Sequence, residues 1–94
     1  MSRKYCLPWA VPGVRVDKQK HVIYLEARHD HVTNELVALV YKSNDCFAVS
    51  GWSGTMIELI SSRFNTVEEA KGAADINLKL QGWTLITERQ VVLL

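Results

Sequence analysis

The tetrapeptide RHDH at residues 28 to 31 gathers the side chains best suited to metal chemistry in this 94-residue chain. Alternate residues of a strand point the same way, so His29 and His31 would share a face, and His21 or Cys46 could add a third ligand for zinc. The set lacks a fourth ligand at a recognisable spacing, and its composition is that of a polar loop. We therefore expect no metal here, but a solvated loop that either contacts a partner or responds to pH.

Two other patterns could support covalent catalysis. Ser53 lies between Trp52 and Gly54 in a sequence similar to a nucleophile elbow, but that motif needs a glycine two places after the serine, where Thr55 stands. Cys46 could pair with a histidine as a thiol nucleophile, yet a lone cysteine that opens a strand is typically a small buried hydrophobic residue. The chain has no glycine-rich phosphate loop and no two-cysteine redox motif. The sequence predicts a protein that is not an enzyme and needs no cofactor.

Large aromatic side chains are the other candidates for binding. If residues 46–52 form a regular strand, Trp52 points to the thinner and more polar of its faces, where it is either covered by the N-terminal arm or serves as an interaction anchor. Trp9 allows the same two interpretations. With the polar loop, these give the predicted partner-binding residues: Trp52, Trp9, His29, His31 and Arg28.

The elements that position these residues follow from the apolar pattern. It predicts an α+β fold: an antiparallel sheet of four to six strands with one main helix, at about residues 67-81, packed on one face. Glu35–Lys42 reads as a strand by its valines, although a short buried helix would fit as well. Short polar turns favour a meander. The other expected strands are Val14–Val16, His21–Glu26, Cys46–Trp52, Thr55–Ser62 and Trp83–Glu88, and residues 28 to 34 are expected to be a polar loop.

The expected helix has a clear beginning and end. Thr66 is a good N-cap and Glu69 can complete a capping box, while Gly82 suits a left-handed stop and Trp83 can pack back on Leu78. The buried stripe is predicted to comprise Val67, Ala70, Ala74 and Leu78, widened by Ala73, Ile76 and Leu80. The solvated side is predicted to comprise Glu68, Lys71, Asp75 and Lys79, with an ion pair between the last two.

The strands expected at residues 35–42 and 55–62 are apolar on both alternating faces. One helix can cover only one face of a sheet, so the second must be covered by the arm, the hairpin, the C-terminal tail or a partner. This is the main sequence-based reason to expect an interface. The apolar tail Val91–Leu94 should likewise dock on its own domain or on another chain, which would make a homodimer.

The whole chain has the composition of one globular domain, with 48% hydrophobic and 22% charged residues. It is expected to comprise an extended arm (1-13), a β-rich part (14-62), the helix (66-82) and a C-terminal strand with its tail (83-94). No apolar run is long enough for a membrane span or a signal peptide, so we expect a cytoplasmic protein with reduced cysteines.

The charge distribution is uneven but weak. Residues 1 to 42 carry seven basic and four acidic groups (+3), and residues 43 to 94 carry four and six (−2). Dedicated nucleic-acid binders usually have a stronger basic excess. DNA binding therefore stays the alternative function, through Arg3, Lys4, Arg15, Lys18, Lys20 and Arg28.

The segment FNTVEEA, residues 64 to 70, follows the predicted three-stranded meander. It resembles the strand-to-helix junction of ethylene-response-type DNA-binding domains and of the N-terminal arm domains of phage tyrosine recombinases, and it is similar to that of many small phage and prophage accessory proteins. The resemblance covers roughly residues 35 to 82. Those DNA-binding domains read the major groove with arginines and tryptophans on their strands, whereas here the strands from Glu35 to Ser62 carry only Lys42, with Arg63 just beyond. The resemblance therefore implies an accessory protein that blocks or redirects a host protein by binding it.

Overall fold

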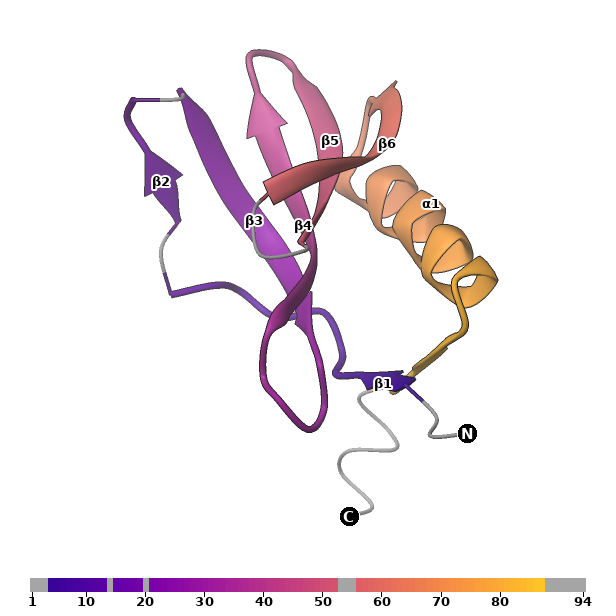
Figure 1. Cartoon of the computed structure of the whole chain (residues 1–94). Coiled ribbons are helices and arrows are strands. Elements are labelled where there is room, and N and C mark those ends of the chain that lie inside the picture. Colours follow the sequence, from indigo (N-terminus) through magenta and orange to yellow (C-terminus); the bar gives the residue numbers. More distant parts are fainter. Residues whose placement is uncertain (1–3, 14, 20, 53–55, 88–94) are drawn as a thin grey trace.

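The chain forms two layers, a five-stranded antiparallel sheet and one helix (Figure 1). The computed structural model describes residues 4–13, 15–19, 21–52 and 56–87, and the side chains of residues 52–62 lie outside this description. The sheet has the strand order β2-β3-β4-β5-β6. Its strands are β2 (Val16–Asp17), β3 (Val22–His29), β4 (Leu36–Ser43), β5 (Cys46–Trp52) and β6 (Met56–Phe64).

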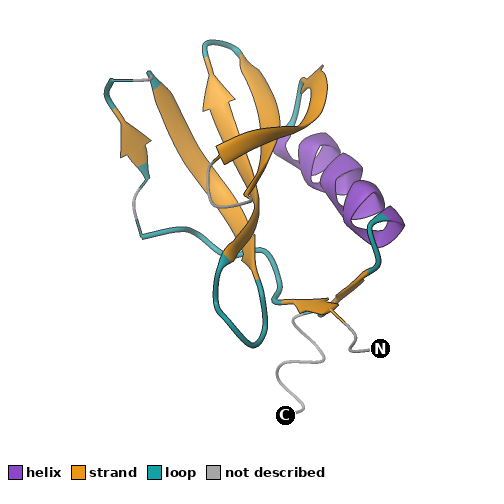
Figure 2. Cartoon of the chain, viewed as in Figure 1, coloured by secondary structure: helices purple, strands orange, loops and turns teal. Residues whose placement is uncertain are grey.

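Helix α1 (Val67–Leu80) packs against β4, β5 and β6 and lies to one side of the sheet in Figure 2. The predicted α+β fold is therefore confirmed, and residues 36–43 are a strand rather than a helix. The turn between β4 and β5 contains Asn44 at φ 57°, a left-handed conformation that asparagine tolerates well.

A second, two-stranded sheet joins the two ends of the described chain. β1 (Lys4–Cys6) pairs in parallel with β7 (Trp83–Leu85). The N-terminal arm then continues along β3, because the Leu7 amide donates to the His29 carbonyl at 2.8 Å and Ala10 bridges Ala27. The arm thus lies between β7 and β3 and packs across the domain as expected.

The ends of α1 are as predicted. The Thr66 hydroxyl accepts a hydrogen bond from the Glu69 amide at 3.1 Å, which caps the first turn. Gly82 has φ 96°, and half-buried Trp83 packs against the core cluster that contains Leu78. The N-cap and the glycine stop are therefore confirmed.

The face that α1 buries differs from the predicted one. Ala70, Ala74 and Leu78 are buried, but Ile76 is 64% and Leu80 82% exposed, so the expectation that these two widen the core stripe is wrong. A helix turns about 100° per residue, so nine residues from Val67 to Ile76 amount to half a turn beyond two full turns. Ile76 therefore points away from the sheet.

The second face of the sheet is covered at its centre by the chain itself. Ala27, Leu39 and Ser50 form one cross-strand row on the face away from α1, and all three are buried, as is Ala48 on the same face. Figure 1 shows β6 bending so that its first half crosses in front of β4. The described centre of the second face is therefore buried within the monomer. The tail Val91–Leu94 lies outside the described residues.

Candidate functional site

Arg28 is the centre of a polar cluster beneath the helix. Its side chain is 7% exposed, and its Nε and Nη2 donate to the Asp75 carboxylate of α1 at 2.9 and 3.3 Å. Its Nη1 donates to the carbonyl oxygens of Leu7 and Ile86 at 2.8 and 3.4 Å. Trp9 completes this Arg28 cluster, since its indole N–H donates to Asp75 at 3.0 Å and its ring lies 5.1 Å from the guanidinium carbon. One cation thereby links β3, the arm, α1 and the segment after β7.

The strand register explains why Arg28 points inward. Arg28 pairs with Ala38 of β4 and Glu26 with Val40, which both lie on the face beneath α1. β3 therefore extends to His29, and the loop expected to begin at residue 28 is shorter than predicted. Alternation along the strand brings both charged residues under the helix.

In a second ion pair the helix carries the positive charge and strand β3 the negative charge. Lys71 Nζ lies 3.2 Å from the Glu26 carboxylate, and both side chains are half-buried. Glu26 and Arg28 are two residues apart on β3, and their partners Lys71 and Asp75 are four residues apart on α1. These two spacings cover similar distances along a strand and along a helix, so both pairs can form together. The predicted ion pair of Asp75 with Lys79 is wrong, because Asp75 turns toward Arg28 instead. Asp75 and Lys71 of α1 thus point toward the sheet, where their ion-pair partners on β3 lie.

The loop between β3 and β4, Asp30–Glu35, is ordered by its own hydrogen bonds. Asp30 Oδ1 accepts from the amides of Val32 and Thr33 at 2.7 and 3.0 Å, and the Asp30 carbonyl accepts from Asn34 at 2.9 Å. The Thr33 hydroxyl accepts from the Glu35 amide at 3.2 Å, and the Asp30 amide donates to the Glu35 carbonyl at 2.8 Å. These bonds make an Asx-type turn of fixed shape.

The electrostatics of Asp30 fit this role. The backbone amides of Thr33 and Val32 hold the pKa of the Asp30 carboxyl below its ordinary value, because hydrogen bonds to the charged form favour ionisation. The carboxylate is therefore charged at neutral pH, when it orders the turn.

The β3–β4 loop presents an apolar and aromatic group on its outside. Val32 is 85% exposed, the largest exposure among the exposed large hydrophobic residues of the described chain. Exposed His31 contacts the half-buried ring of Tyr5 edge-on at 6.4 Å, and its amide donates to the Tyr5 carbonyl at 2.9 Å. We call Tyr5, His31 and Val32 the loop-tip group. Strand β1 thus supports the loop from the side.

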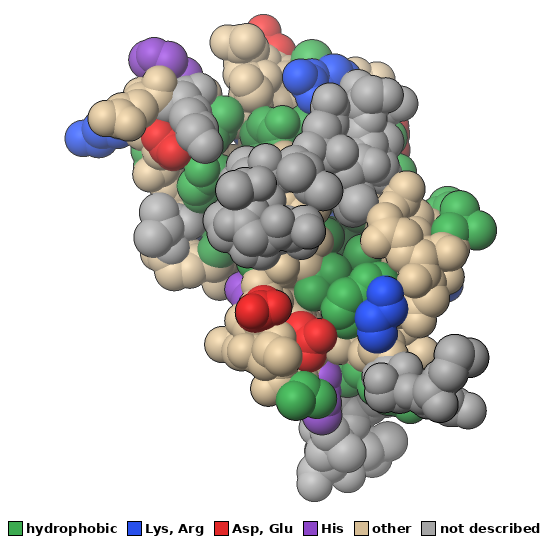
Figure 3. All heavy atoms as spheres, in the orientation of Figure 1, with side chains coloured by type: hydrophobic (Ala, Val, Ile, Leu, Met, Phe, Trp, Pro, Cys, Tyr) green, Lys and Arg blue, Asp and Glu red, His purple; other side chains and the backbone are tan. Residues whose placement is uncertain are grey.

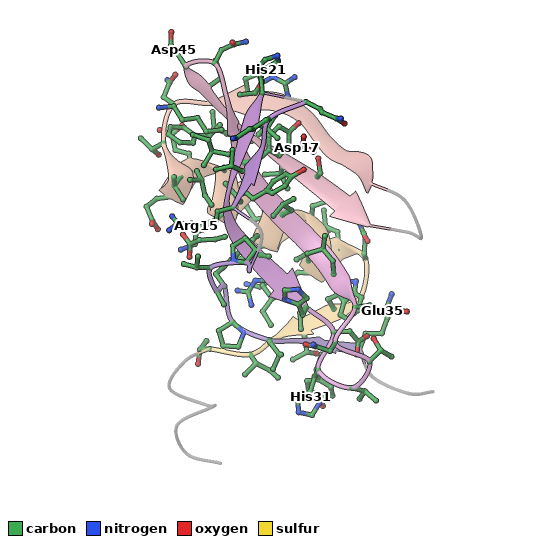
Figure 4. The ribbon with its side chains drawn as sticks, turned by 90° about the vertical axis from the view of Figure 1, so that its left-hand side faces the viewer. Arg15, Asp17, His21, His31, Glu35 and Asp45 are labelled. Carbon is green, nitrogen blue, oxygen red and sulfur yellow. The ribbon has the colours of Figure 1, made fainter. Side chains whose placement is uncertain are left out.

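The histidines do not converge on a metal site. Figure 4 shows His31 at one end of the molecule and His21 near Asp45 at the other, and Cys46 follows Asp45 in the chain. His29 is half-buried at the end of β3, after a register shift that interrupts the strand alternation expected for His29 and His31. Within the described ranges, no group of three potential ligands could hold a metal ion.

The tryptophans predicted as contacts have different positions. Trp9 is half-buried and packs against both core clusters, which corresponds to the covered alternative. The side chain of Trp52 lies outside the described residues, as do Ser53 to Thr55 of the elbow-like sequence. Sequence reasoning missed Tyr5 and Val32 altogether, although Asp30 followed by threonine and asparagine at short spacing was a usable signal for an ordered turn.

The basic residues are dispersed. Lys4 lies on β1 with its ammonium 5.0 Å from the Trp83 ring, whereas Arg15 and Lys18 flank β2 at a distant part of the fold. Arg28 is buried in its cluster, and Arg3 and Lys20 lie outside the described residues. On the described part of the face in Figure 3, the Lys and Arg side chains occupy separate places rather than one patch.

Both cysteines are free, and they differ in environment. Cys6 is fully buried where β1 meets β7, and this burial raises the pKa of its thiol to about 11. Cys46, expected to be buried, is half-buried at the start of β5.

The single described helix is too short and too polar to cross a membrane. Comparisons of the chain with protein-family models, with curated proteins and with solved structures give no match. The evidence for the candidate site is therefore the geometry of the loop-tip group and of the Arg28 cluster.

Proposed function

We propose that this chain is a non-enzymatic binding module that recognises a protein partner through the loop-tip group. In the form that the sequence resemblance favours, it is a phage-type inhibitor or modulator of a host protein in the cytoplasm. The observation that carries the proposal is the combination of a hydrogen-bonded loop with an 85% exposed Val32.

Order in the free loop is an advantage for binding. A loop already held in one conformation loses little conformational entropy when a partner docks, so more of the contact energy appears as affinity. The Asp30 turn and the Tyr5 backbone contact supply that order before any partner arrives. Scaffold-supported loops commonly carry recognition for this reason.

The chemistry of the loop tip suits a protein surface. Tyr5 and His31 combine apolar rings with hydrogen-bonding atoms, and tyrosine is enriched at protein interfaces. Val32 can fill a small apolar pocket, while Glu35 at the end of the loop is an exposed carboxylate. A small apolar centre with a polar rim is the usual arrangement of an interface.

Affinity capture from a bacterial lysate tests the proposal. Immobilised wild type is compared with Val32→Asp, and Val16→Asp is the matched control because Val16 is 55% exposed on β2, away from the loop. We expect a protein that wild type and Val16→Asp retain and that Val32→Asp loses. Capture of the same proteins in the same amounts by all three would contradict the proposal.

Two further experiments extend the capture test. Trp52→Ala tests the tryptophan predicted as an anchor, and equal recovery would remove Trp52 from the candidate contacts. Retention on double-stranded DNA that weakens steeply as salt rises would favour the DNA-binding alternative instead, because phosphate contacts release counterions.

A further inference from the structure

The outer face of α1 carries an apolar pair that no described residue covers. Ile76 is 64% and Leu80 82% exposed, one helical turn apart, on the side opposite the buried Ala74 and Leu78. The space over Gly72, one turn before Ile76, is open, since a Cβ there would meet nothing within 4 Å. Figure 3 shows hydrophobic side chains projecting on the side of the molecule where α1 lies.

We infer that this face binds the same face of a second copy of the chain, with the two α1 helices antiparallel about a two-fold axis at Ile76. Gly72 and Leu80 each lie four residues from Ile76. The two-fold arrangement therefore places Leu80 of each copy over Gly72 of the other, so that a large side chain fills the hollow left by a glycine, twice. Such self-complementarity is what a two-fold interface requires.

The charges of the helix favour the same arrangement. Glu68 and Glu69 lie in its first turn and Lys79 in its last turn. With the axis at Ile76, Lys79 of one copy lies opposite Ala73 of the other, about one helical turn from Glu69 and within reach of its carboxylate, and the helix dipoles run in opposite directions. Neither Glu69 nor Lys79 has an ion-pair partner within the described part of the chain, so both are available.

The size of the face limits the strength of the dimer. The helix has 14 residues and is about 21 Å long, so the contact is at the small end of specific interfaces. We expect a reversible dimer that forms at about 100 µM rather than an obligate one. This inference is independent of the role proposed for the loop-tip group.

Sedimentation equilibrium over about 10 µM to 1 mM tests the inference. Wild type should shift from monomer to dimer mass, and Leu80→Lys should weaken dimerisation by about tenfold or more, because buried apolar area is lost and a charge is placed in the contact. Gly72→Leu should do the same by filling the hollow, and the Cβ that it adds meets no atom within 4 Å in the monomer. Val32→Asp is the control and should dimerise as wild type does.

A charge exchange tests the orientation. Glu69→Lys and Lys79→Glu should each weaken the dimer, and the double variant should regain most of the wild-type association, since the exchange restores opposite charges only between antiparallel copies. Wild type that stays monomeric throughout, Leu80→Lys that dimerises as well as wild type, or a double variant no better than the single ones would each overturn the inference.

Discussion

The guanidinium of Arg28 is almost withdrawn from water, so its donors depend on acceptors within the protein. Two of its nitrogens bind the Asp75 carboxylate, and the third is shared between two backbone carbonyls. No buried side-chain nitrogen or oxygen in the described part of the chain lacks a partner. A buried cation is tolerated only when it is satisfied in this way, so each of its partners should matter to stability.

Removing one member of the Arg28 cluster should destabilise the fold. Asp75→Ala is expected to lower the free energy of unfolding by about 2–3 kcal/mol, somewhat less than for a fully buried pair because the Asp75 side chain is 28% exposed. Lys71→Met, which breaks the more exposed pair with Glu26, should cost below about 1 kcal/mol. Urea denaturation measures both, and equal losses would contradict the special role of Arg28.

Replacing both charged partners separates the cost of a lone charge from the worth of the pair. Arg28→Met combined with Asp75→Leu removes the buried cation together with its acceptor, so the double variant should be more stable than Asp75→Ala. A double variant that is less stable than either single one would show that the backbone contacts of Arg28 matter more than its pairing.

The Asp30 turn should depend on acid pH. Because its amide donors lower the folded pKa of Asp30 below the ordinary 3.8, the order that they provide is present above that value and is lost as pH falls through the folded pKa. The amide chemical shifts of Val32 and Thr33 should therefore move together on titration to about pH 2. Asp30→Asn, which has no carboxylate, should show no such step, and unchanged wild-type shifts would contradict the assigned turn.

At the scale of elements, the rotation of α1 is the most consequential feature. The helix buries small residues and one leucine, and it turns Lys71 and Asp75 toward β3 while Ile76 and Leu80 face outward. Charged side chains at the margin of the helix thus act with the apolar stripe to set its orientation. The two exposed residues should then be almost irrelevant to the stability of the monomer.

Matched leucines on α1 test this orientation. Leu78 is 1% exposed and Leu80 is 82% exposed. Leu78→Ala should cost about 2–5 kcal/mol through lost burial and the cavity left behind, whereas Leu80→Ala should stay within about 0.5 kcal/mol. Thermal unfolding at low protein concentration, where self-association is negligible, compares them, and similar losses would show that the buried face is wrongly assigned.

Local signals in the sequence were sufficient for much of the fold. The caps at Thr66 and Gly82 and the turn at Asn44 depend on neighbouring residues, and each was predictable. Arg28 was not, because its partner Asp75 lies 47 residues away and the pairing depends on how a strand and a helix are set against each other. The exposure of Val32 was not predictable for the same reason, because it follows from a turn that is held partly by Tyr5, a residue distant in the sequence.

At the scale of the whole molecule, three distant segments meet at Cys6. Its backbone pairs with Leu85 of β7 and bridges Asp30 after β3, and its side chain is fully buried in a core cluster with Leu78. Opening this junction should require separation of the arm, the sheet and the end of the helix together. The Cys6 thiol therefore reports on the integrity of the whole domain.

Thiol labelling gives a direct measurement of that integrity. At about pH 8 an alkylating reagent should react with half-buried Cys46 in the folded protein and spare Cys6, whose thiol is buried and whose pKa is raised to about 11. Cys46→Ser leaves Cys6 as the one thiol, and its labelling should follow global unfolding in urea. Rapid labelling of Cys6 without denaturant would contradict a closed junction.

The parallel pairing of β1 with β7 also has a consequence for how the protein is made. Lys4 is synthesised before the large sheet and α1, whereas its strand partner Trp83 is synthesised after them. The arm therefore stays unpaired until β7 has been synthesised. The hydrogen bond from Arg28 to the Ile86 carbonyl can form only after Ile86 has left the exit tunnel of the ribosome. The domain is consequently completed only when β7 has joined β1, and nascent chains stalled before β7 should be markedly more sensitive to protease than chains that include β7.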